Sequence, residues 1–327
     1  MLKVLAGPLD IVTHTCEAEP QHVILVPNRL VARVPFSGLP VSSDKLVLDT
    51  TILCFRPFST WETVPLDIKG PYLGVSYWRD DDEFPLHFAE SEVKACAKFC
   101  VKEGIESTLI LRPDAKREGL PPSIDSTRYQ PTSPDIMSAC QKAQIVHLAT
   151  HLRKDKNRDD LEDQSVIHLS GDDTLTHLNI NKVEFDRPAL VILSMCGSGQ
   201  GDINKGVEDN YMFSRHFARA GATHMVVSIV QQLDDWGSAV IVPRMFKILL
   251  ENPKLTAAEA LHQAQLWFKN ADPKGRLDNV IKWCKEEGML VDERMMQVSR
   301  TRNQERKLTE NQKASKAEIV GALVAYG

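Results

Sequence analysis

The chain has 327 residues, a formal net charge of −5 at pH 7 and a hydrophobic content of 43%. That length accommodates one large core or two smaller ones. No surplus of basic residues is present, so direct nucleic-acid binding is not expected. The sequence has neither an apolar run of about 20 residues nor a signal-peptide core at its start. We therefore expect a cytoplasmic protein without a membrane partner.

The seven cysteines are spread along the chain and contain no CxxC pair. Zinc ribbons use such pairs, and disulfide frameworks use even numbers of cysteines. The sequence therefore predicts no metal site, and Cys96 and Cys100, four residues apart on a helix, are expected to pack in the core.

The first part of the chain, about 1–85, is rich in predicted strands. Short β-prone runs lie at 23–26, 46–53 and 72–76, each bounded by proline, glycine or aspartate. Helical spacing over 90–101 then leads into a strand at 108–111. An alternation of helix and strand begins here.

The alternation continues through the middle of the chain. Ser133 and Pro134 predict an N-cap and a first helical residue, and a strand follows at 145–149. A charged run at 153–163 predicts an exposed loop. A strand at 166–169, a turn at 171–173 and a short helix after 179 precede the most apolar strand, 189–194, which we expect to be buried on both faces.

The C-terminal part predicts three further helices and two strands. The helices cover 210–220, 235–250 and 256–268, and the first of them ends at Gly221, a residue suited to a helix C-cap. A strand is predicted at 224–228 and a closing strand at 319–327, with a possible helix at 277–287 between them.

This order of elements predicts an α/β fold with a mostly parallel central sheet and helices on both faces. We expect one domain over 1–327, with a catalytic core at about 86–268 and an extension with a closing segment at 269–327.

Two predicted strand ends carry residues with reactive side chains. His151 follows the strand at 145–149, and Cys196 follows the strand at 189–194 at the start of a glycine-rich turn. Parallel sheets gather such ends at one edge, and neighbouring strands lie about 4.8 Å apart. A cysteine nucleophile needs a base within hydrogen-bonding reach, and His151 can supply it. His147 is expected to be a core or supporting residue.

The residues around these positions resemble a known family. His147-Leu-Ala-Thr-His151 is similar to the H-x-A-x-H-G motif of CHAT domains, and Leu193-Ser-Met-Cys196-Gly-Ser-Gly199 is similar to their L-S-A-C-x-S-G motif. Val23 to Phe36 resembles the opening P-x-x-x-L-x-x-x-P-F pattern, and Phe88 to Val93 resembles the A-E-x-E-V helix start. The resemblance extends from about 20 to about 268.

CHAT domains are relatives of caspases and separases, so the resemblance implies a caspase-like fold and a cysteine endopeptidase. By that resemblance Cys196 is the nucleophile and His151 the general base, and no cofactor is needed. Backbone N–H groups at Gly197 and Leu152 are candidate oxyanion donors. The expected partners are a protein substrate and a regulatory partner or fused sensor domain, in defence or cell death.

The resemblance also implies a substrate preference. In separase-like relatives an acidic residue selects a basic side chain before the scissile bond, and Asp234 and Asp235 occupy a comparable loop here. Cleavage after arginine or lysine is the corresponding prediction. The alternative is that these two aspartates are an ordinary helix N-cap.

Two other functions stay open. Leu152 stands where the family has glycine, and the family's C-terminal signals are missing from 313–327. These departures favour a catalytically inactive interaction scaffold. The third possibility is hydrolysis or transfer of a small acyl group by the same two residues. Zinc and phosphate-loop sites are not expected, because the HExxH, GxGxxG and GK[ST] patterns are absent.

Overall fold

The structure is a computed structural model with side chains. It describes residues 21–25, 37, 39, 46–55, 65–66, 68–77, 86, 88–115, 120–128, 131–154, 165–169, 173–186, 189–196, 198, 213–228, 235–270, 276–289 and 323–326. Within these residues, no helix is long and apolar enough to cross a membrane.

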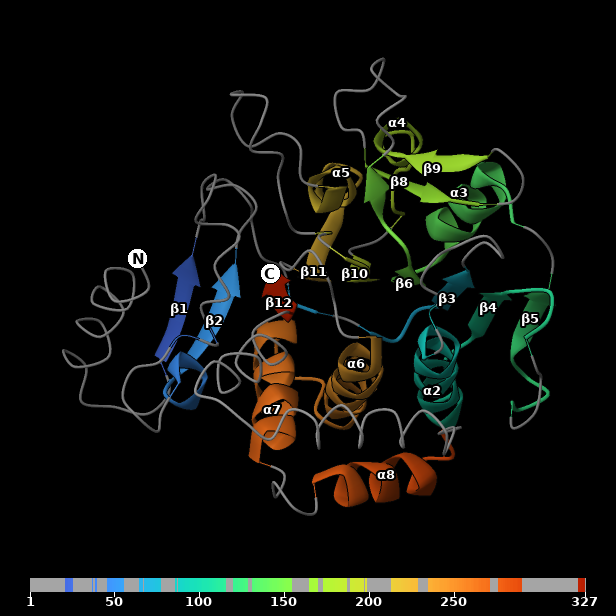
Figure 1. The fold of residues 1–327 in the computed structure, drawn as a ribbon. Helices are drawn as coiled ribbons and strands as arrows, with labels where there is room; N and C mark the ends of the chain where they lie inside the picture. Colours follow the sequence, from blue (N-terminus) through green and yellow to red (C-terminus); the bar gives the residue numbers. More distant parts are fainter. Residues whose placement is uncertain are drawn as a thin grey trace.

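A nine-stranded sheet forms the centre of the described part of the chain (Figure 1). Its strands, in spatial order, are β1 (Gln21–Leu25), β2 (Thr51–Phe55), β12 (Leu323–Tyr326), β11 (Ala222–Ser228), β10 (Ala189–Ser194), β6 (Ile145–Thr150), β3 (Tyr72–Tyr77), β4 (Ser107–Leu111) and β5 (Asp125–Arg128). All neighbouring pairs are parallel except β11 and β12. The prediction of a mostly parallel sheet is therefore confirmed.

Helices cover both faces of the sheet, as predicted. One layer contains α2 (Ala89–Lys102), α6 (Asp235–Glu251), α7 (Ala257–Asn270) and α8 (Arg276–Glu286), and the other contains α3 (Ser133–Lys142), α4 (His177–Ile180) and α5 (Phe213–Arg219). Figure 1 shows the first layer below the sheet and the second above it. We call the two sides the α2 face and the α3 face.

Side chains of the central strands point alternately into the two cores. In β6, Ile145 and Ala149 belong to the core on the α2 face, while Val146 and Leu148 belong to the core on the α3 face. Successive strand residues point to opposite faces, so a strand covered on both sides must be apolar throughout. The apolar run of β10 has the same cause, and its predicted burial on both faces is confirmed.

The N-terminus of α3 differs from the prediction by one residue. Thr132, not Ser133, is the N-cap, and its backbone N–H donates to Asp135 Oδ2 at 2.9 Å in a capping box. Ser133 is already helical, and its N–H donates to Asp173 Oδ2 at 2.5 Å. Thr132 and Ser133 are adjacent hydroxyl residues, and both residue types are favoured at an N-cap.

A second, three-stranded antiparallel sheet was not predicted as a unit. It contains β7 (Arg153–Lys154), β8 (Ser165–His168) and β9 (Thr174–Thr176). Residues 153 and 154, expected in an exposed loop, pair with β8, and the rest of that predicted loop lies outside the described residues. Strands of two or three residues are too short to show a period of two.

Two other local predictions need correction. The run expected as one strand over 46–53 contains a short 3-10 helix, η3 (Val47–Asp49), before β2. The short helix expected after Asn179 begins earlier, at His177, because Thr176 is its N-cap and bonds to Asn179. Both errors lie at element ends, where caps decide the boundary.

The chain returns to the sheet at its C-terminal end, as predicted, but to an interior position. β12 lies between β2 and β11, parallel to the first and antiparallel to the second. Leu323 is buried, and its carbonyl accepts a hydrogen bond from Gln265 Nε2 of α7 at 3.0 Å. β12 therefore joins β1 and β2 to the six parallel strands that run from β11 to β5 in the sheet.

Candidate functional site

The two reactive strand ends belong to neighbouring strands. β6 pairs directly with β10, in parallel, from Ile145 opposite Leu190 to Ala149 opposite Ser194. His151 comes just after the carboxyl end of β6, and Cys196 just after the carboxyl end of β10. The structure thus brings the ends that carry them to the same edge of the sheet.

The register gives the relative height of the last paired residues of the two strands. Counting two residues forward from the last pair, Ala149 and Ser194, leads to His151 and Cys196 together. Adjacent strands are about 4.8 Å apart, and residues two apart point to the same face. The ladder itself ends at the pair of Ala149 and Ser194 and Cys196 lies in the turn that follows, so placement of the two side chains next to each other is an expectation that the register supports.

Cys196 differs from the other described cysteines in exposure. It is partly exposed, whereas Cys54, Cys96, Cys100, Cys140 and Cys284 are buried. Burial raises the pKa of Cys100, Cys140 and Cys284 to about 12, and raises that of Cys96 well above its usual range. Those four thiols stay protonated and shielded, and Cys54 is buried as well, which leaves Cys196 as the described cysteine suited to nucleophilic attack.

Hydrogen bonds hold the turn after Cys196 in place. Ser198 is fully buried, and its hydroxyl donates to the Leu193 carbonyl at 3.2 Å and accepts from the Ser228 N–H at 3.0 Å. Its carbonyl accepts from the Ser214 N–H of α5 at 3.1 Å. The residue two positions after Cys196 is therefore tied to β10, β11 and α5.

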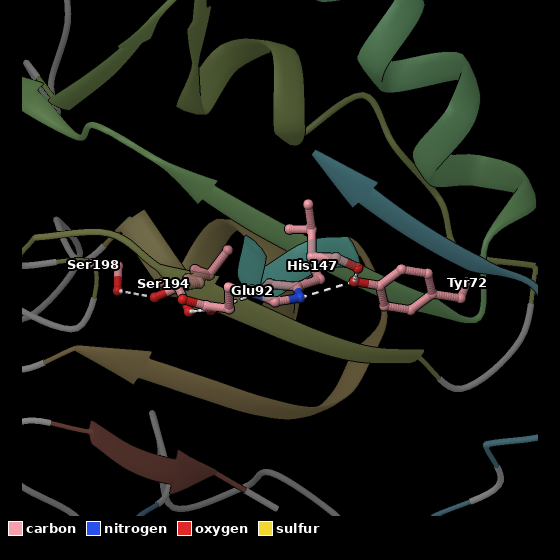
Figure 2. A network of polar contacts seen from close by, with 7 residues as sticks. Tyr72, Glu92, His147, Ser194 and Ser198 are labelled. Carbon is pink, nitrogen blue, oxygen red and sulfur yellow. Dashed lines mark hydrogen bonds and ion pairs between the residues drawn. The ribbon is translucent and has the colours of Figure 1, made fainter. Parts of the chain in front are cut away.

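A buried polar network lies one level below the strand ends, on the α2 face. Glu92 of α2 is 1% exposed, and its Oε1 accepts from the Ser194 hydroxyl at 2.5 Å and lies 2.8 Å from His147 Nε2. The Tyr72 hydroxyl of β3 lies 2.9 Å from His147 Nδ1. Figure 2 shows Glu92 between Ser194 and His147, with Tyr72 beyond His147. The prediction gave Glu92 no role.

One signal in the sequence did point to Glu92. It shares a helical face with Ala89 and Cys96, three residues before and four after, and both are buried. A carboxylate on the apolar face of a helix needs a buried partner. Of the two histidines in the strand motif, His147 is that partner, which agrees with its predicted supporting role.

The remaining predicted site residues are only partly described. Leu152 is half-buried and packs against the core on the α3 face. Asp235 begins α6, and Gly197 and Asp234 lie outside the described residues. The oxyanion and substrate-pocket assignments therefore stay predictions.

No group of three or more histidine, cysteine, aspartate or glutamate side chains in the described part of the chain is placed to hold a metal ion. The Glu92 and His147 pair is enclosed, because both side chains are 0% or 1% exposed. The arrangement can thus support acid–base and nucleophilic chemistry at the strand ends, above a sealed polar layer.

Comparison with known protein families gives a match over most of the chain. A family model described as CHAT domain matches residues 3–304. No curated protein matches the chain.

Proposed function

The chain belongs to the CHAT domain family, whose members are caspase-like, and on that basis we propose that it is a cysteine endopeptidase. Cys196 is the nucleophile and His151 the general base in this proposal. The observation that supports it is the register of β6 and β10, in which Ala149 pairs with Ser194, two residues before His151 and Cys196 respectively. The partial exposure of Cys196 supports it as well.

The reaction follows from these two groups. His151 takes the thiol proton of Cys196, and the thiolate attacks the peptide carbonyl carbon, which forms a C–S bond and an oxyanion. Backbone N–H groups at Gly197 and Leu152 are the proposed donors to that oxyanion. The C–N bond then breaks as His151 returns the proton to the leaving amine. Water, deprotonated by His151, hydrolyses the thioester and releases a carboxylic acid and the thiol.

We propose a basic residue before the scissile bond. In the sequence, Asp234 and Asp235 follow β11, and Asp235 is the first residue of α6; β11 is the neighbour of β10 on the side away from β6. A carboxylate there would pair with an arginine or lysine side chain of the substrate. The substrate is a protein partner, and a sensor region or complex controls its cleavage, in defence or cell death.

A catalytically inactive scaffold is the second candidate, and one observation favours it. Leu152 replaces the family glycine directly after His151, and it packs against the core on the α3 face. If an active enzyme needs a left-handed backbone there, leucine would cost about 1 to 2 kcal/mol. A scaffold would retain the fold and lack turnover.

A randomised peptide library tests the proposal. The wild-type chain and the Cys196→Ala variant are incubated with the library, and cleavage sites are identified by mass spectrometry. The proposal expects cuts after arginine or lysine with the wild type alone. Cuts of equal yield with both proteins would refute the role of Cys196, and silence from both would favour the scaffold or a missing activator.

A further inference from the structure

The Glu92 side chain contacts both central strands of the candidate site. Its Oε1 accepts from Ser194 of β10 and contacts His147 of β6. Ser194 comes two residues before Cys196, and His147 comes four residues before His151. A single carboxylate oxygen thus joins the two strands just below their reactive ends (Figure 2).

Both nitrogens of the His147 ring face a polar partner. Nε2 lies 2.8 Å from Glu92 Oε1. The Tyr72 hydroxyl lies 2.9 Å from Nδ1 and 3.3 Å from the Val93 carbonyl, so Nδ1 is its nearer partner. Both ring nitrogens of His147 are therefore engaged, and its ring cannot rotate without breaking both contacts.

The other side of the Cys196 turn is held independently. Ser198, two residues after Cys196, bonds to Leu193 and Ser228. The nucleophile therefore lies between two buried serines, one fixed to α2 through Glu92 and the other fixed to the sheet. Of the two, only Ser194 also connects to the strand that carries His151.

We propose that Glu92 is a positioning residue that sets the alignment of Cys196 with His151. It acts through Ser194 and His147 and does not touch the substrate. Because the bond is made at the last residue of β10, loss of the carboxylate lets the two strand ends shift relative to each other. A displacement of about 1 Å can lower a rate about 100-fold. This inference rests on the proposed dyad of Cys196 and His151.

The variants separate geometry from charge. Glu92→Gln keeps an oxygen able to accept both hydrogen bonds, whereas Glu92→Met keeps the length and removes the acceptor. Glu90→Gln is the matched control, because Glu90 lies on the same helix and pairs with Lys94 instead. For each folded variant, kcat and KM are measured on a peptide that the wild type cleaves, together with the pH dependence of Cys196 alkylation.

We expect Glu92→Met to lower kcat by about tenfold to 100-fold with little change in KM. Its alkylation midpoint should rise toward the value of a free thiol, about 8.5. Glu92→Gln and Glu90→Gln should stay close to wild type in both measurements. A folded Glu92→Met with wild-type kcat and alkylation, or a Glu92→Gln as impaired as Glu92→Met, would overturn the inference.

Two further comparisons keep the result decisive. If Glu92→Met does not fold, Ser194→Ala replaces it, and wild-type kcat and alkylation in that variant overturn the inference. If the wild type cleaves no peptide, alkylation alone decides. If replacing His151 slows the alkylation of Cys196 in the wild type but not in the Glu92 or Ser194 variant, positioning is supported although the protease proposal fails. If replacing His151 slows alkylation just as much in the variant, positioning is overturned.

Discussion

Cys196 differs from the buried cysteines in the environment of its sulfur. Cys96, Cys100, Cys140 and Cys284 are enclosed, and burial raises the pKa of each. The sequence identified Cys196 by its glycine-rich turn, and the structure adds that the other described thiols are shielded. The reactivity of Cys196 can therefore be compared with that of the buried thiols in the same protein.

We predict that iodoacetamide modifies Cys196 of the native protein well before the buried cysteines, because alkylation requires an accessible thiolate. Timed quenching, proteolysis and mass spectrometry measure the order, and the protein unfolded in guanidinium is the control in which every cysteine reacts. Adducts at Cys96 or Cys100 that form as fast as those at Cys196 would contradict the assignment.

Gly74 makes room for the Tyr72 side chain to reach His147. Gly74 is level with His147 in the sheet, and a Cβ built on it would lie 2.9 Å from the Tyr72 hydroxyl and 2.7 Å from Leu109 Cδ2. Only a residue without a side chain fits between them. Nothing in the sequence indicates this constraint, because it arises from the packing of three neighbouring strands, β3, β4 and β6.

We therefore predict that Gly74→Ala lowers the free energy of unfolding by about 1 to 3 kcal/mol through overpacking. Tyr72→Phe is the comparison, since it removes the hydroxyl alone and should cost about 1 to 2 kcal/mol. Urea denaturation followed by circular dichroism measures both. A Gly74→Ala protein as stable as wild type would show that the hydroxyl can leave His147 without cost.

At the scale of elements, regular hydrophobic patterns in the sequence predicted the helices and strands whose apolar side chains form the core. The helix at 90–101 and the strand at 189–194 were found almost as expected, as α2 and β10, because each shows its buried face directly in the sequence. Boundaries were less predictable, as the caps at Thr132 and Thr176 show. Very short strands such as β9 were missed because they have too few residues to show a periodic pattern.

The capping box of α7 provides a test at this scale. The Thr256 N–H donates to Glu259 Oε2 at 2.7 Å, and the Glu259 N–H donates to Thr256 Oγ1 at 3.2 Å. We predict that Thr256→Ala lowers the free energy of unfolding by about 1 kcal/mol, whereas Thr256→Ser changes it little. Thermal and urea unfolding measure the difference, and equal stability of the two variants would argue against the cap.

The strand β11 and the helix α5 carry histidines that favour the neutral form. Burial lowers the pKa of His224 from 6.5 to about 4, and burial together with nearby His177 lowers that of His216 to about 4. The unfolded chain therefore binds more protons than the native protein between about pH 6.5 and 4. Their contribution to stability is complete above pH 6.5 and is lost as the pH falls through that range.

We predict that the free energy of unfolding decreases from pH 7 to pH 4.5, with about 1 to 3 kcal/mol of the loss due to His224. The His224→Gln variant should show a shallower decrease over that interval, because it has no group to protonate there. Urea titrations at several pH values measure the slope. An identical pH dependence in the variant would remove His224 as a cause.

At the scale of the whole molecule, the sequence predicted the class of fold but not the order of the strands. The α/β alternation gave a parallel sheet with two helical layers, and the closing strand was expected at 319–327. Its insertion between β2 and β11 was not, because strand order depends on contacts between distant segments. The neighbouring positions of β6 and β10 likewise required the structure, although both reactive ends were predicted.

We predict that Leu323 of β12 contributes strongly to stability despite lying near the end of the chain. Leu323→Ala should lower the free energy of unfolding by about 2 to 4 kcal/mol, since the side chain is 2% exposed and lies in the core on the α2 face. Leu178→Ala, at a position 49% exposed, should cost less than about 0.5 kcal/mol. Equal losses in urea denaturation would mean that β12 is not part of the cooperative core.

The central claim is that His151 activates Cys196, and a thiol-reactive peptide probe tests it most directly. The probe carries arginine before an electrophilic carbonyl and is incubated with the wild type, His151→Ala and Cys196→Ala, and the adducts are mapped by mass spectrometry. We predict selective labelling of Cys196 that is lost when His151 is replaced. Labelling of Cys196 at the same rate in His151→Ala would contradict the claim and leave the inactive scaffold as the better account.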